Sequence, residues 1–237
     1  MKRFYKKAEV APGAGGHGVV LDGRLVKTAG KHDLIVPSLA LATAVAAEWE
    51  AQQGKIRRDA MPLTRLAGAT IDRNSTEREA IVRRVAHYAG TDLVCYRAAH
   101  PPALTVRQQA VWQPLIDWAI ERYDTPLVVT TGVIPASQPA ASLEAFTMVV
   151  AGRDDFSLTA LHAATAACGS LVIAFALLEG RLGAAEAFAA SQLDESFQIE
   201  AWGEDTEQAK RRAELAAEIE AAARFISLLR GQPVDKI

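Results

Sequence analysis

Acidic, amide and large apolar side chains alternate in residues 191–205, and this stretch has the residue types most suited to chemistry. Three carboxylates stand close together there, Asp194, Glu195 and Glu200. Paired carboxylates serve as the general acid and base of glycoside hydrolases. Such enzymes usually also present aromatic platforms, and only 6% of this chain is aromatic. The spacing therefore permits an acid and base site but does not identify one.

On a helix, with about 100° between successive residues, this stretch has two sides. One side carries Leu193, Phe197 and Glu200, and the other carries Glu195, Gln198, Ile199 and Trp202. A carboxylate on a buried stripe costs several kcal/mol unless it is paired or hydrated. Catalysis, an internal ion pair and contact with a partner protein all account for these acids. Trp202 stands at the helix end, where a core position and an interface position fit equally, whereas we expect Trp49 in the core.

Other candidate motifs are weaker. Cys95 could act as a nucleophile with His87 or His100, but no local signature supports this, and a buried inert thiol is the simpler interpretation. Residues 13–18 match the G-x-G-x-x-G pattern, yet a strand comes directly after them where a phosphate loop requires a helix. The five histidines lack the spacing of a helical zinc site, so we expect no metal and no nucleotide cofactor.

Composition narrows the classes of partner. A net charge of −2 and a pI near 6.2 give no basic footprint, so neither nucleic acid nor an anionic membrane surface is the expected partner. The two cysteines, Cys95 and Cys168, lie far apart and indicate a reducing compartment. Residues 158–178 are long and apolar, but they include His162, Thr165 and Ser170 and lack basic flanks. They predict a buried core helix instead of a membrane span.

The elements that position these residues fall into two kinds. Apolar runs at 19–21, 24–27 and 34–36 predict strands, the first two joined by an Asp22-Gly23 hairpin turn. Pro37 ends the third run, and Ser38 is placed to cap a helix over 39–53. The residues beyond it are predominantly helical in pattern. The fold class predicted is α+β, with a small N-terminal β-rich domain at 1–58 and a larger helical domain at 59–237.

Within the helical part, two capping boxes predict helix starts, Thr76 with Glu79 and Thr105 with Gln108. Pro114 should kink the second of these helices or mark its true start. A short strand or extended connector is expected at 127–134. Further helices are predicted over 141–150, 157–179, 183–202 and 205–229.

Several segments in the same order resemble the family of assembly chaperones that bind the α subunit of the F1 sector of ATP synthase. The matching pieces are Lys2-Arg3-Phe4-Tyr5-Lys6, Leu21-Asp22-Gly23-Arg24 with Val26-Lys27-Thr28, Val36-Pro37-Ser38, Glu48-Trp49, Met61-Pro62-Leu63-Thr64-Arg65-Leu66-Ala67, Thr91-Asp92-Leu93 with Cys95-Tyr96-Arg97, and Ser191-x-Leu193-Asp194-Glu195 with Gln198-x-Glu200-x-Trp202-Gly203. Each piece alone is weak, but together they span some two hundred residues.

The resemblance implies a non-enzymatic chaperone, monomeric when free, that holds a newly made α subunit until the β subunit arrives. Its partner-binding residues would be Asp194, Glu195, Gln198, Glu200 and Trp202, with Glu195 the expected contact and Glu200 the expected brace. Eukaryotic members act in the mitochondrial matrix and carry a transit peptide, whereas this chain begins near the matching Lys2-Arg3 segment, so we expect a bacterial cytoplasmic protein. A small hydrolase using the same acids, or Cys95 with a histidine, is the alternative.

Overall fold

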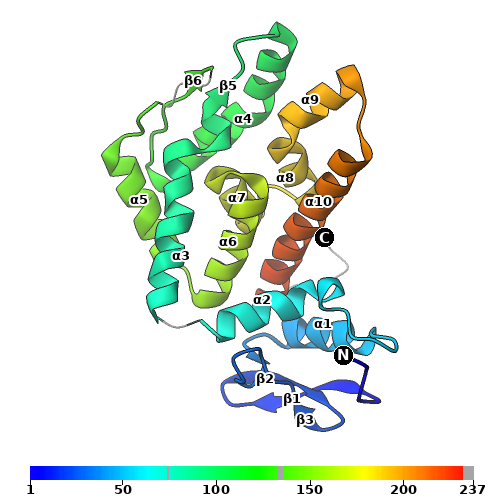
Figure 1. The fold of residues 1–237 in the computed structure, drawn as a ribbon. Coiled ribbons are helices and arrows are strands. Elements are labelled where there is room, and N and C mark those ends of the chain that lie inside the picture. The colour runs from blue at the N-terminus through cyan, green and yellow to red at the C-terminus, as the bar shows by residue number, and fades with distance from the viewer. Residues whose placement is uncertain (74, 133–135, 232–237) are drawn as a thin grey trace. The chain divides into compact units, whose positions relative to one another are not determined.

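Strands lie mainly in the first 36 residues, and helices form most of the remaining chain (Figure 1). The computed structural model describes residues 1–73, 75–132 and 136–231. The chain divides into two compact units, the first made of Met1–Ser75, Asp155–Ala160 and Arg224–Ile237 and the second of Thr76–Asp154 and Leu161–Ala223. The predicted α+β class is confirmed. The predicted domain boundary between residues 58 and 59 stays a prediction.

The sheet of the first unit is built around β2. Its strands are β1 (Ala8–Gly13), β2 (Gly16–Leu21), β3 (Arg24–Leu25) and β4 (Ile35–Val36). Strand β2 pairs antiparallel with each of the other three. Asp22 and Gly23 both have positive φ angles, 48° and 80°, as the two-residue turn of a hairpin requires. The Asp22-Gly23 hairpin is therefore confirmed, whereas β1 was not predicted.

Helices α1 (Leu39–Glu50) and α2 (Pro62–Ile71) complete this part of the chain, with the 3-10 turn η1 (Arg58–Ala60) between them. The Ser38 hydroxyl accepts a hydrogen bond from the amide of Leu41 at 3.4 Å, so the predicted cap is present. The Glu48 carboxylate accepts from the amides of Leu63 and Thr64, both at 2.8 Å. One acidic side chain of α1 thus caps the first turn of α2.

In the described part of the second unit, the regular elements are helices and one pair of two-residue strands. Strands β5 (Tyr96–Arg97) and β6 (Thr130–Thr131) pair in parallel. The helical elements are α3 (Ser75–His87), η2 (Tyr88–Thr91), η3 (Leu93–Cys95), α4 (Pro102–Tyr123), α5 (Ala140–Ala151), α7 (Leu171–Leu178), α8 (Ala184–Ser191) and α9 (Leu193–Trp202). Helices α6 (Asp155–Cys168) and α10 (Thr206–Leu229) contribute residues to both units.

Two predicted helices are each two helices in the structure. The continuous helix expected over 157–179 is wrong, because Gly169 adopts a positive φ of 64° and Ser170 begins α7 by accepting from the amide of Ile173 at 3.0 Å. The helix expected over 183–202 is broken at Gln192, whose φ and ψ of −110° and 24° separate α8 from α9. Apolar periodicity continues through both breaks, so it did not indicate them.

Three smaller predictions differ from the structure or fall partly outside it. Helix α4 begins at Pro102, and Thr105 lies inside it, so Thr105 is not an N-cap; its hydroxyl donates to the Ala98 carbonyl at 2.8 Å. Pro114 is an internal residue of the same helix. The strand expected at 127–134 is limited to Thr130–Thr131 among the described residues, which exclude 133 and 134. The Thr76 side chain also lies outside the described part.

The core of the second unit centres on α7. All eight residues of this helix are buried, and it packs against α4 and α8. Its Phe175 stacks on Phe146 of α5, with ring centroids 6.2 Å apart, and lies 4.9 Å from the ring of Tyr123. Across the described residues, none of the helices has the length and apolar character needed to cross a membrane. The apolar stretch at 158–178 instead supplies buried residues to α6 and α7.

Candidate functional site

Helix α9 carries all five residues predicted to contact a partner. It packs on α4 and α8, and its first residue, Leu193, is buried. It ends at Trp202 because Gly203 takes a positive φ of 84°, outside the helical region. Arg212 of α10 braces it, donating to the Ser196 hydroxyl at 3.1 Å and pairing with Glu204 at 3.2 Å. Neighbouring helices thus fix the position of α9 on one side.

Two of the five residues are engaged by α4. Asp194 accepts a hydrogen bond from the Gln108 side chain at 2.8 Å. Glu200 forms two hydrogen bonds with the Arg107 guanidinium, at 2.7 and 2.9 Å. These bonds hold the pKa of the Glu200 carboxyl below its ordinary value. The Arg107 guanidinium also lies 5.3 Å from the ring centroid of Phe197, so one arginine contacts two residues of α9.

The other three residues face solvent, and so does the side chain of Glu200, which is 58% exposed. Glu195, Gln198 and Trp202 are exposed, and they recur at helical spacings of three and four. The Trp202 side chain is 81% exposed. Within the described part of the chain, Glu195 has neither an ion pair nor a side-chain hydrogen bond. We call these three side chains the α9 surface.

Helix α4 adds exposed groups that sequence reasoning missed. Its buried stripe runs through Leu104, Gln108, Trp112 and Leu115, and Val106 and Val111 lie off that stripe with 69% and 37% exposure. Arg107 stands next to Val106 and lines a cavity of about 380 Å³ with Val111, Leu193 and Ser196. Apolar residues displaced from the stripe of an amphipathic helix are the signal that could have identified them.

The thiol of the hydrolase alternative is poorly suited to nucleophilic attack. Cys95 is fully buried, and burial together with nearby Asp92 raises the pKa of its thiol to about 12, so the thiol is protonated near neutral pH. His100 is exposed. The glycine-rich segment at 13–18 forms the turn between β1 and β2 and the start of β2, a context that does not present helix amides to a phosphate. Among the described residues, no three metal-ligating side chains lie together.

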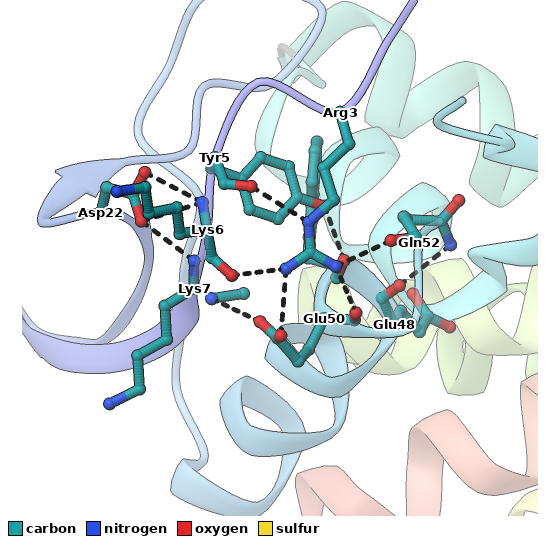
Figure 2. Close-up of polar contacts among 10 residues, drawn as sticks. Arg3, Tyr5, Lys6, Lys7, Asp22, Glu48, Glu50 and Gln52 are labelled. Atoms are coloured by element: carbon teal, nitrogen blue, oxygen red, sulfur yellow. Dashed lines mark hydrogen bonds and ion pairs between the residues drawn. The ribbon is translucent and has the colours of Figure 1, made fainter. Parts of the chain in front are cut away.

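Another sequence motif has a structural role at the N-terminus, shown in Figure 2. The Arg3 guanidinium donates to the backbone carbonyls of Tyr5, Lys6, Glu50 and Gln52 and to the Glu50 carboxylate, at 2.7 to 3.1 Å. The Tyr5 hydroxyl donates to the Trp49 carbonyl at 2.6 Å. Asp22 in the hairpin turn accepts from the amides of Lys6 and Lys7. We call these contacts the Arg3 network.

A buried acid fixes the start of α7. Asp92 is fully buried and accepts from the Ser170 hydroxyl at 2.5 Å and from the amides of Leu171 and Val172 at 2.8 and 3.0 Å. It also accepts from the amide of Val94 at 3.2 Å. Burial outweighs these donors and raises the pKa of Asp92 to about 6. The acid at the centre of the Thr91-Asp92-Leu93 motif therefore braces the core.

The fold is that of a class of chaperones with solved structures. The crystal structure of Atp12 from Paracoccus denitrificans matches with a TM-score of 0.91 and 41% identity, over 97% of this chain and 98% of that chain. An aspartate-to-lysine mutant of the same protein matches equally well. Identity at this level over nearly the whole length means that the two chains share one fold.

Sequence comparison agrees with the structural match. The family model described as ATP12 chaperone protein matches residues 2–120. Protein atp12, mitochondrial, of Schizosaccharomyces pombe is 23% identical over 214 residues, which are 85% of this chain and 74% of that protein. The chain belongs to the ATP12 chaperone family. The resemblance found from the sequence motifs is thereby confirmed.

Proposed function

We propose that this chain binds the free α subunit of the F1 sector of ATP synthase and shields its exposed interface until the β subunit arrives. Its family is one of chaperones for F1-ATPase assembly. That the client is the α subunit is what the resemblance of the sequence motifs implies. An unassembled subunit exposes a half-interface, which is an aggregation hazard. A chaperone that covers this interface keeps the subunit soluble.

The exposed Trp202 carries the proposal. Tryptophan is highly buried on average in folded proteins, whereas Trp202 is 81% exposed at the end of a helix. Tryptophan is enriched among the residues that dominate binding energy at protein interfaces. Glu195 and Gln198 lie on the same face of α9 and supply polar groups beside it. This combination of an apolar anchor and a polar rim suits a client that must be bound and later released.

The three acids of α9 have two different roles in this proposal. Glu195 is unpaired within the described residues and can present its charge to the client, in place of a charged group of the absent β subunit. Glu200 is held by Arg107 and keeps α9 against α4. Asp194 is held by Gln108 in the same way. We therefore assign contact to Glu195, Gln198 and Trp202, and positioning to Asp194 and Glu200.

We propose that the chain binds its client stoichiometrically and catalyses no reaction. We also propose that it acts as a monomer in a bacterial cytoplasm. The protonated Cys95 thiol and the lowered pKa of Glu200 weigh against the hydrolase alternative, because a nucleophile must be deprotonated and a general acid needs a raised pKa. Sedimentation of the free protein measures its oligomeric state, and a stable dimer would contradict the monomer proposal.

Co-expression with the cognate α subunit tests the proposed function directly. We expect more soluble α subunit with this chain than without it, and a co-purified complex. The Glu195→Lys variant should fold normally and recover less α subunit, since Glu195 has no internal partner to lose among the described residues. Lysine at Glu214, an exposed acid of α10, makes the same change of charge and is the control. Equal amounts of soluble α subunit in all four cultures would contradict the proposal.

A further inference from the structure

We infer that the first unit carries a second client-binding site, a groove around Trp49 that receives a segment combining apolar side chains with carboxylates. This inference rests on the proposed chaperone function, because it assigns the segment to the client. It concerns residues 1–75 alone, whereas the α9 surface lies in the second unit.

Two adjoining cavities form the groove. One has a volume of about 400 Å³ and the other about 600 Å³, and both are lined by Val26, Lys27, Trp49 and Arg58. We call the combined hollow the Trp49 groove. Cavities of this size accept several side chains of a bound segment. Trp49, which we expected in the core, is only half-buried and forms a wall shared by the two cavities.

Exposed apolar groups continue the wall at the N-terminus. Met1 and Phe4 line the larger cavity, and they are 68% and 65% exposed. Figure 2 shows the hydrogen bonds that hold Arg3 and Tyr5, the residues before and after Phe4 in the sequence. The Phe4 ring packs edge-on against the Tyr5 ring, with centroids 5.4 Å apart. The network therefore keeps an apolar side chain at the surface. A held apolar wall of this kind indicates a binding surface.

The charges that line the groove are mainly positive. Four basic side chains line the two cavities, Arg24, Lys27, Arg58 and Arg65, against two acids, Asp22 and Asp72. Both acids already accept internal hydrogen bonds, Asp22 from two backbone amides and Asp72 from Thr28, Gly30 and His32. Lys27 pairs with Asp33 at 2.7 Å. No described residue pairs with the guanidinium of Arg24 or of Arg58.

This charge pattern indicates which kind of client segment binds in the groove. The whole chain has a net charge of −2, so the excess of basic side chains that line the groove is opposite in sign to the charge of the whole chain. Guanidinium groups bind carboxylates through paired hydrogen bonds. The complementary ligand is a client segment with apolar residues for the hollow and aspartate or glutamate for Arg24 and Arg58.

An array of overlapping peptides that covers the cognate α subunit, probed with the full-length chaperone, tests this inference. We expect the bound peptides to combine apolar residues with Asp or Glu. The double variant Arg24→Glu, Arg58→Glu should bind them at least tenfold more weakly. The matched control is Arg84→Glu, Arg211→Glu, which reverses two exposed arginines of the second unit and should change binding less than twofold.

Equal binding by the two double variants, or binding only of peptides without acids, would overturn the inference. If the wild type binds none of the peptides yet keeps co-expressed α subunit soluble, the groove is not a client site and the proposed function stands. If the groove binds peptides but α subunit is not protected, only the proposed function fails. A wild-type dimer that Arg24→Glu, Arg58→Glu dissociates would show that a second copy fills the groove, contradicting the inference.

Discussion

At the scale of single residues, Trp202 should dominate binding on the α9 surface. We expect Trp202→Ala to weaken α-subunit binding by about tenfold or more, because truncating a tryptophan hot spot typically removes about 2 kcal/mol. Met148→Ala is the matched control, since Met148 is also strongly exposed and also lies in the second unit. Binding is measured as α subunit retained in a quantitative pull-down. Equal losses for the two variants would contradict a specific role for Trp202.

The ion pair of Arg107 and Glu200 should affect client binding by holding α9 in position on α4. We expect Glu200→Arg to lower the midpoint of thermal unfolding and to weaken client binding, because two arginines then face each other across α4 and α9. Adding Arg107→Glu restores opposite charges and should recover both properties. Thermal unfolding and the pull-down are measured on the same samples. If the reversed pair recovers stability but not binding, Glu200 contacts the client directly.

Buried Asp92 should make stability depend on pH in an unusual direction. Its pKa is about 6 in the folded protein and about 3.9 when unfolded, so the folded state holds the proton more tightly. The contribution of Asp92 to stability is therefore greatest below pH 4 and falls, by up to roughly 3 kcal/mol, as pH rises through 6.

Asp92→Asn removes this titration. The free energy of unfolding of the wild type, minus that of the variant, should decrease as pH rises from 4 to 7. Denaturant unfolding at several pH values measures it, and the subtraction cancels the other carboxyl groups. A difference that stays constant with pH would show that the four donors to Asp92 offset its burial.

At the scale of elements, the break between α6 and α7 should depend on Gly169. Alanine there must adopt a φ near +64°, although its Cβ would meet no atom within 4 Å. We expect Gly169→Ala to destabilise the protein by about 1 kcal/mol from backbone conformation alone. Gly68→Ala is the comparison variant, since Gly68 is helical and a Cβ added there would also meet no atom within 4 Å.

Gly68→Ala should stabilise the protein by about 0.5–1 kcal/mol, because alanine is the better helix former. The difference in unfolding free energy between the two variants is the quantity to measure. Similar effects of both substitutions would mean that the break is set by Ser170 and Asp92 and not by the glycine.

Local signals predicted part of these elements. Asp22-Gly23 and Ser38 act through neighbours in sequence, and both were predicted correctly. At the start of α7 the Ser170 hydroxyl donates to Asp92, 78 residues earlier, and the apolar periodicity of one segment cannot register so distant a partner. Strand β1 was missed because its sequence, Ala8–Gly13, contains proline and glycine and is stabilised by pairing with β2.

The candidate site was predicted to a similar extent. Helical geometry separated Leu193, which is buried, from Glu195, Gln198 and Trp202, which are exposed. It also put Glu200 on the packed side, and this was wrong, because Glu200 is exposed. The partners of Asp194 and Glu200 could not be predicted, since Gln108 and Arg107 lie on a helix some ninety residues earlier. The positioning roles of Asp194 and Glu200 follow from their hydrogen bonds to these two residues of α4.

At the scale of the whole molecule, the α9 surface and the Trp49 groove should contribute independently to client binding. No described residue belongs to both sites, so their effects on the free energy of binding should add. We expect the fold-loss of the triple variant Trp202→Ala, Arg24→Glu, Arg58→Glu to equal the product of the losses of Trp202→Ala and of the double variant. Pull-down titration of all three gives the comparison.

If the triple variant loses less binding than the product of the two separate losses, the client occupies one site at a time. A loss restricted to one site would indicate that the other has no part in binding the α subunit. The combination Trp202→Ala, Arg84→Glu, Arg211→Glu is the control, and it should show the loss of Trp202→Ala alone.

The exposure of Trp202 also makes the protein its own optical reporter. An indole in water fluoresces at longer wavelength than one in an apolar environment, and the chain contains only four tryptophans. One of the other three, Trp112, is fully buried, and its indole N–H donates to the Ala190 carbonyl. When a client covers α9, the long-wavelength part of the emission should move toward the blue, so capture and release can be followed in real time without a label.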